Sequence, residues 1–266
     1  MYQFKEEISS HQFFWWDKKL IKNMNWALLP KSSKAVFPVI ACHANEKGEA
    51  FPSERTIAIL AGVSDKTARE GIRGLEEYPG FKLNYYLSQR GKRAKKYMLK
   101  LPSSNNSGSA FPFFKFVLEA GIWREMIPSA KALYPVMRCF GFFDVNLYEE
   151  FEDELEIEIN DFDEIYSDRE YDFCEAELSI MAEYTGLHRN SIIAALNDLE
   201  RNFLIEPLSG HNGWKVFLKS KDSTIWKRDH LNKKVMDSYK HILQCTKSTG
   251  NGTQKLPNDA QKGSER

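Results

Sequence analysis

Residues 61–69 have the sequence Ala61-Gly62-Val63-Ser64-Asp65-Lys66-Thr67-Ala68-Arg69, which contains the end of one predicted helix and the start of the next. Gly62 ends one helix at a tight turn, because glycine adopts left-handed backbone angles at little cost. Ser64 begins the next helix by offering its hydroxyl to free backbone N–H groups. Ala68, Ile72 and Leu75 recur at helical spacing and form the buried stripe of that second helix. The pattern predicts two helices joined by a tight turn.

The preceding sequence supplies the first of these helices and two more. Ser53 caps the first helix, and Glu54 lies in its first turn, where the helix dipole favours an acid. A further helix is expected over residues 34–44. The apolar spacing from Phe13 to Asn25 predicts an N-terminal helix before it.

The following sequence predicts a β-hairpin. Residues 81–87 and 97–101 alternate as strands do. Between them lies a tip with five cations in seven residues: Arg90, Lys92, Arg93, Lys95 and Lys96. A helix-turn-helix followed by such a basic hairpin is the pattern of a winged helix.

The chain repeats this unit. Trp26, Lys34-Ala35, Pro38-Val39 and Cys42 recur 97 positions later as Trp123, Lys131-Ala132, Pro135-Val136 and Cys139. Ala61-Gly62-Val63 and Leu75-Glu76 recur 124 positions later as Thr185-Gly186-Leu187 and Leu199-Glu200. The difference of 27 positions indicates one insertion in the second copy. The predicted fold is mainly α with small β-wings (α+β), built as two tandem winged helix-turn-helix domains.

The expected domain organisation follows from the repeat and from composition. A first winged helix with its N-terminal helix covers residues 1–101, and a flexible polar linker covers 102–110. A second winged helix covers 111–220 and contains an acidic insertion over 142–172. A basic helix is expected over 221–246 and a disordered tail over 247–266.

The net charge of zero conceals a strong asymmetry between the copies. Residues 1–101 hold 18 Lys and Arg against 10 Asp and Glu, a net charge of +8. Residues 102–220 hold 9 against 22, a net charge of −13. A basic half beside an acidic half indicates a polyanionic partner for one of them only.

The first copy carries its cations on the two elements that contact DNA in a winged helix. The last helix of such a unit enters the major groove, where Arg and Lys match the acceptors of guanine. The candidate DNA-binding residues are Ser64, Asp65, Lys66, Thr67, Arg69, Arg73, Arg90, Lys92, Arg93, Lys95 and Lys96. Lys66 and Arg69 are the preferred base readers, and Thr67 and Arg73 the preferred phosphate contacts. A merely solvated charged face is the alternative.

The second copy lacks most of these cations. Arg69 is replaced by Ile193, and Ser64 by His188, a poorer cap. Ile193 on the outer face favours a dry contact with protein, which predicts a dimerisation or partner-binding module and a possible homodimer. The alternative is a second DNA reader that uses Arg189, Asn190 and Ser191. The acidic insertion has three interpretations: a solvated loop, a cover for the second copy's helix, or an autoinhibitory segment folded onto the basic hairpin.

Catalysis is not expected. No phosphate-binding glycine motif is present, and the histidines and cysteines show no metal-ligand spacing, so neither a metal nor a cofactor is predicted. Cys42 and Cys139 fall at equivalent, apolar-flanked helix positions, which indicates core packing in a reducing compartment. No apolar run is long enough for a membrane span. These observations predict a cytoplasmic protein with no membrane partner.

The run Phe51-Pro52-Ser53-Glu54-Arg55-Thr56-Ile57-Ala58 and the turn Gly62-Val63-Ser64-Asp65-Lys66-Thr67 resemble a bacterial winged helix-turn-helix family. That family is common in replication and regulatory proteins of plasmids and phages. The resemblance covers residues 30–101 well and residues 125–220 only weakly. It implies binding to double-stranded DNA as a transcriptional regulator or as a replication initiator. The alternative is a protein-interaction scaffold that uses both winged helices as docking modules.

Overall fold

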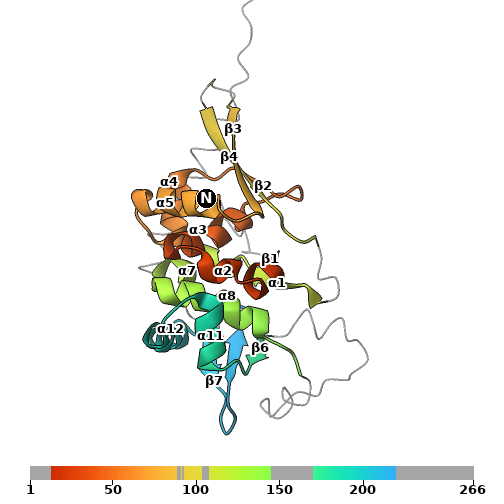
Figure 1. The fold of residues 1–266 in the computed structure, drawn as a ribbon, viewed down its shortest axis with the longest axis vertical. Coiled ribbons are helices and arrows are strands. Elements are labelled where there is room, and N and C mark those ends of the chain that lie inside the picture. The colour runs from red at the N-terminus through yellow and green to blue at the C-terminus, as the bar shows by residue number, and fades with distance from the viewer. Residues whose placement is uncertain (1–12, 89–90, 92, 104–107, 145–169, 220–266) are drawn as a thin grey trace, which may run out of the picture. The chain divides into compact units, whose positions relative to one another are not determined.

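The computed structural model describes residues 13–88, 91, 93–103, 108–144 and 170–219, which form a mixed structure of helices and strands. The elements of the first half, in chain order, are β1 (Phe13–Asp17), α1 (Lys18–Lys22), α2 (Asn25–Leu28), α3 (Lys31–Cys42), β2 (Glu49–Ala50), α4 (Glu54–Ala61), α5 (Asp65–Leu75), β3 (Phe81–Leu87) and β4 (Arg93–Leu99). Figure 1 shows the β3–β4 hairpin rising beyond α4 and α5.

The second half has the same order of described elements. They are β5 (Ala110–Phe114), α6 (Phe116–Glu119), α7 (Ile122–Glu125), α8 (Pro128–Phe140), β6 (Tyr171–Cys174), α11 (Leu178–Thr185), α12 (Arg189–Arg201), β7 (Ile205–Pro207) and β8 (Trp214–Phe217). The two three-stranded sheets also correspond, with the antiparallel strand orders β2-β4-β3 and β6-β8-β7.

The N-terminal region differs from the predicted helix. Residues Phe13–Asp17 form strand β1, and only Lys18–Lys22 continue as a helix. The strand is favoured because β1 pairs antiparallel with β5 of the second half, from Phe13 opposite Phe114 to Asp17 opposite Ala110. The prediction of one helix from Phe13 to Asn25 is therefore wrong.

The core lies where the two halves meet. Helices α3 and α8 contact each other, and nearly all of their central residues are buried. The indole N–H of Trp26 donates to the carbonyl of Ala132, and that of Trp123 donates to the carbonyl of Ala35, both at 2.9 Å. Each bond is the 97-position counterpart of the other. Reciprocal contacts of this kind are expected between two units that are related by a twofold axis.

One pair of contacts shows how the halves have diverged. At the start of α8, the backbone N–H of Ile127 donates to Asp198 at 2.9 Å. The corresponding positions in the first half are Pro30, which has no N–H, and Gly74. A Cβ on Gly74 would lie 3.0 Å from Pro30 Cγ and 2.4 Å from Ser33 Oγ, so a larger residue there would require these side chains to shift. The acceptor Asp198 therefore occurs in the second half, where the backbone N–H of Ile127 needs a partner. The first half has proline in place of that donor and glycine in place of that acceptor.

Several predicted segments lie outside the described residues. They are most of the acidic insertion (145–169), part of the linker (104–107), and everything from residue 220, including the expected basic helix and tail. Ala110, which the sequence places at the end of the linker, begins strand β5. The chain divides into two compact units, Met1–Trp226 and Lys227–Arg266, and the second unit has no described residue.

Candidate nucleic-acid interface

The turn between α4 and α5 has the geometry that the sequence predicts. Gly62 ends α4 with a left-handed backbone (φ +65°), and the predicted caps are confirmed. Ser53 Oγ accepts from the N–H of Thr56 at 3.0 Å, and Ser64 Oγ accepts from the N–H of Thr67 at 3.1 Å. These caps fix where α5 begins, and therefore which of its residues face outward.

Helix α5 buries one face closely against α3. Ser33 Oγ donates to the carbonyl of Gly71 at 2.8 Å, and a Cβ on Gly71 would lie 2.6 Å from the carbonyl oxygen of Ser32. Ala68, Ile72 and Leu75 are buried beside it, as predicted. Gly71 therefore permits a close approach of the α3 backbone that a side chain at this position would prevent.

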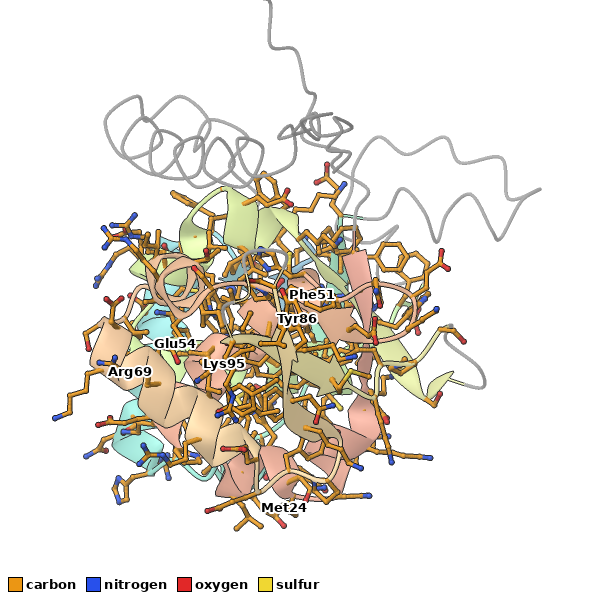
Figure 2. The ribbon with its side chains drawn as sticks, turned by 90° about the horizontal axis from the view of Figure 1, so that it is seen from above. Met24, Phe51, Glu54, Arg69, Tyr86 and Lys95 are labelled. Atoms are coloured by element: carbon orange, nitrogen blue, oxygen red, sulfur yellow. The ribbon has the colours of Figure 1, made fainter. Side chains whose placement is uncertain are left out.

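The opposite face of α5 is exposed. It carries Lys66, Arg69 and Arg73 together with two acids, Asp65 and Glu70. Among the described residues none of the three cations forms an ion pair. Figure 2 shows the Arg69 side chain pointing away from the body of the protein. The helix thus presents unneutralised cations on a surface that no described element covers.

Two of the predicted contacts have a structural role. The hydroxyls of Ser64 and Thr67 lie 2.9 Å apart within the cap of α5. Thr67 Oγ1 can accept from the Ser64 hydroxyl and still donate its own hydrogen to a phosphate oxygen, so the cap is compatible with the predicted phosphate contact.

The hairpin has fewer cations at its tip than the sequence predicts, because β4 begins at Arg93 and not at Tyr97. Lys95 and Lys96 lie within this strand and pair with acids at the base of the hairpin. Lys95 Nζ lies 2.5 Å from Glu54 Oε1, and Lys96 Nζ lies 3.0 Å from Glu49 Oε1. The placement of both lysines at the tip is wrong. Arg90 and Lys92 lie outside the described residues.

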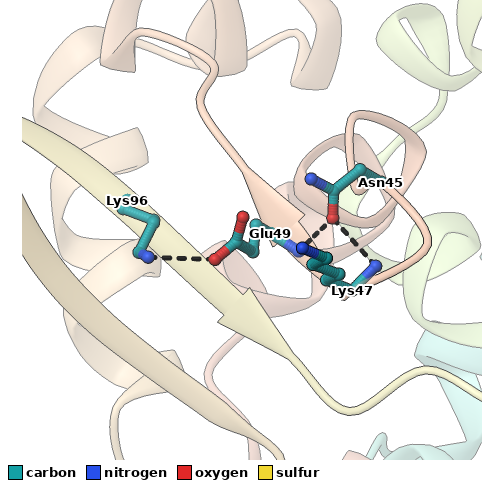
Figure 3. A network of polar contacts seen from close by, with 4 residues as sticks. All are labelled: Asn45, Lys47, Glu49 and Lys96. Carbon is teal, nitrogen blue, oxygen red and sulfur yellow. Dashed lines mark hydrogen bonds and ion pairs between the residues drawn. The ribbon is translucent and has the colours of Figure 1, made fainter.

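The contact between Lys96 and Glu49 belongs to a small polar network at the start of β2. Asn45 Oδ1 accepts from the backbone N–H groups of Lys47 and Glu49, both at 3.0 Å, as Figure 3 shows. The hydrogen bond from Lys96 holds the pKa of the Glu49 carboxyl below its usual range, and Asn45 adds to the effect. The network links β2 to β4 at the base of the hairpin.

Arg93 is the exposed cation of the described part of the tip. Its guanidinium carbon lies 3.9 Å from the centre of the Tyr85 ring, a cation–π contact. Exposed apolar residues accompany it, and none of them was predicted as a site residue: Phe51, Tyr85, Tyr86 and Leu87. The sequence does contain a signal for these residues, because residues 85–87 are three consecutive apolar residues in a predicted strand. A strand with one buried face has a polar residue at every second position, so such a run indicates exposed apolar side chains.

The second half directly supports the α4–α5 turn. Lys131 Nζ donates to the carbonyl of Ala61, the last residue of α4, at 2.8 Å. A Cβ on Gly62 would lie 2.1 Å from the carbonyl oxygen of Arg124. Lys34 makes the reciprocal contact with the carbonyl of Thr185 at 2.9 Å. Burial lowers the pKa of Lys34 and of Lys131 to about 8, so both amines remain largely protonated at neutral pH.

The corresponding turn of the second half has a different surface. His188 caps α12 weakly, since its Nδ1 accepts from the N–H of Asn190 at 3.4 Å. Arg189, Asn190 and Ile193 are exposed, and Ser191 is half-buried. Ile193 is 44% exposed, so an apolar side chain occupies the position of Arg69.

Other site chemistry is limited in the part of the chain that the structure describes. No three His, Cys, Asp or Glu residues there are grouped so that they could hold a metal ion. Burial raises the pKa of Cys139 and Cys174 to about 11, so these thiols stay protonated. No helix among the described residues is long and apolar enough to cross a membrane.

Two capped helices joined at a left-handed glycine, with the second exposing a cationic face, define a helix-turn-helix domain. Residues 27–78 match a family model described as a helix-turn-helix domain. No curated protein and no solved structure matches the chain. A helix-turn-helix domain of this kind suggests DNA binding.

Proposed function

We propose that the protein binds double-stranded DNA sequence-specifically through a winged helix formed by residues 13–101. The observation that carries the proposal is the exposed row of Lys66, Arg69 and Arg73 on α5, which has no ion pair with any residue that the structure describes. In a helix-turn-helix the N-terminal residues of the second helix contact base edges in the major groove. The buried face of α5 is fixed by its close packing on α3, so this row has a defined orientation.

The roles within the row follow from position along the helix. Lys66 and Arg69 lie toward the N-terminus of α5 and are assigned to base edges, where Arg and Lys match guanine acceptors. Arg73 lies in the last turn and is assigned to phosphate. The hairpin adds Arg93 as a second, separate electrostatic contact.

The second half is proposed to be a second winged helix in tandem, and to act through protein contacts. Its net charge of −13 over residues 102–220 repels a phosphate backbone. The exposed Ile193 on α12 favours an apolar contact, and a second copy of the chain is the proposed partner. Within the chain, the second half also holds the α4–α5 turn through Lys131.

The biological role is proposed to be that of a cytoplasmic transcriptional regulator or a replication initiator of a mobile element, without catalysis. The arrangement of binding sites on DNA distinguishes these two roles. A footprint over a single palindrome at a promoter favours regulation. Arrayed direct repeats beside an A·T-rich segment favour initiation.

An electrophoretic shift assay with a random-sequence duplex at two salt concentrations tests the proposal. A protein that neutralises about four phosphates loses roughly a hundredfold in affinity between 50 and 200 mM salt. We expect a shift with this salt sensitivity. No shift at low salt contradicts the proposal and favours the alternative, a scaffold in which both halves are protein docks.

A further inference from the structure

The β3–β4 hairpin has one face that turns toward the helix-turn-helix. Cross-strand pairing places Leu83 opposite Tyr97, Tyr85 opposite Lys95 and Leu87 opposite Arg93 on this face. The bond from Lys95 to Glu54, the first residue of α4, shows which way the face is turned. Figure 2 shows Lys95 and Glu54 lying together beside the helices.

The outer end of this face projects beyond the core. Tyr97 is fully buried, whereas Tyr85 is 48% exposed and Leu87 is 75% exposed. Four residue steps along the strand lead from the Leu83–Tyr97 pair to the Leu87–Arg93 pair, a distance of about 13 Å. The minor groove of B-DNA is about 7.5 Å deep. The Leu87–Arg93 pair therefore lies farther beyond the buried Tyr97 than the minor groove is deep.

The exposed apolar surface at this end is small. Arg93 covers one face of the Tyr85 ring, so Leu87 is the main uncovered apolar side chain on this side of the hairpin. A protein partner needs about 800 Å² of surface on each side. A single leucine provides far less than that, but it matches the apolar wedges that enter between base steps from the minor groove.

We propose that Leu87 is a minor-groove wedge that partly unstacks one base step and bends the bound duplex. This inference rests on the proposed function and adds DNA bending to it. Arg93, directly across the ladder, is placed to lie in the same groove, where the negative potential attracts arginine. The net charge of +8 over residues 1–101 favours the same partner, a DNA duplex, over an apolar surface.

Fluorescence energy transfer between dyes at the two ends of a 30-base-pair duplex, selected from a random pool for binding, tests the wedge with the full-length chain. Intercalating wedges kink DNA by roughly 20–90°. We expect the wild-type chain to raise transfer efficiency and Leu87→Ser to abolish most of that rise, while its affinity changes by less than about fivefold. Tyr86→Ser is the matched control, because Tyr86 is 40% exposed and lies on the opposite face.

The outcomes separate the wedge from the proposed function. Bending by the wild-type chain and by Tyr86→Ser, but not by Leu87→Ser, supports the wedge. Binding without bending, or equal bending by Leu87→Ser, overturns the wedge and leaves DNA binding in place. Absence of any binding to the duplex pool by the wild-type chain overturns both.

Discussion

Lys34 and Lys131 occupy equivalent positions in the two halves, and each ammonium group donates to the last carbonyl of a helix in the opposite half. Lys34 caps α11 at Thr185, and Lys131 caps α4 at Ala61. Carbonyls at a helix end have no partner within the helix, so these bonds satisfy groups that burial would otherwise leave unpaired. The helix-turn-helix of each half is thus completed by the other half.

Lys131→Met should destabilise the protein, because the carbonyl of Ala61 loses its charged donor in a buried setting. The expected loss is about 1–3 kcal/mol in the free energy of unfolding, measured by urea denaturation. Lys34→Met should cost a similar amount. Losses below about 0.5 kcal/mol for both variants would show that the reciprocal bonds contribute little.

Gly62→Ala should be more harmful than alanine at another left-handed glycine. Gly62 has φ +65°, and a Cβ added there would lie 2.1 Å from the Arg124 carbonyl oxygen, whereas Gly210 has φ +78° and no described atom within 4 Å of an added Cβ. Left-handed strain costs roughly 1–2 kcal/mol at either site. The clash should add at least about 2 kcal/mol at Gly62, measured by thermal denaturation of the two variants. Equal losses would argue against close packing at the α4–α5 turn.

The cations of the hairpin should differ in their contribution to DNA binding. Arg93 has no acidic partner among the described residues, so Arg93→Met should reduce the slope of log affinity against log salt by about one. Lys95 is already paired with Glu54 and should change that slope much less. Fluorescence anisotropy across a salt series gives both slopes. An equal reduction by Lys95→Met would mean that the ion pair opens on binding.

The Glu49 carboxyl should titrate below its ordinary pKa of 4.5, mainly because of the hydrogen bond from Lys96. The folded-state pKa is lowered, so the ionised carboxylate stabilises the fold above the unfolded pKa. That contribution is lost as the pH falls through the folded value. Carbon-detected NMR titration should show the pKa of Glu49 rising toward 4.5 in Lys96→Met. Identical titration in both proteins would exclude the bond in solution.

Local signals in the sequence identified the helix-turn-helix correctly. The caps at Ser53 and Ser64 and the left-handed Gly62 depend on neighbouring residues only, and all three are confirmed. The buried face of α5 followed from helical spacing. The close approach at Gly71 depends on α3 and not on α5 alone, so the sequence of α5 does not predict it.

Features that depend on distant residues could not be predicted in this way. Phe13–Asp17 consists of four aromatic residues followed by one acid, so its sequence has no alternation of apolar and polar residues. The burial of every second residue follows only from the pairing with β5. Lys95 and Lys96 resembled a continuous basic tip because their acidic partners lie 41 and 47 positions away. The sequence repeat identifies Lys34 and Lys131 as equivalent residues. It does not reveal that each of them donates to a helix of the opposite half.

Salt-dependent duplex binding by two triple variants distinguishes a specific contact through α5 from a general effect of positive charge. Replacement of Lys66, Arg69 and Arg73 by alanine removes the exposed row of α5. Replacement of Lys19, Lys22 and Lys31, which are also exposed, removes the same charge from α1 and the start of α3. The proposed function predicts that the α5 variant loses at least about a hundredfold in affinity, while the control variant keeps most of its binding. Equal losses in the two variants would contradict it, because net charge alone would then explain the binding.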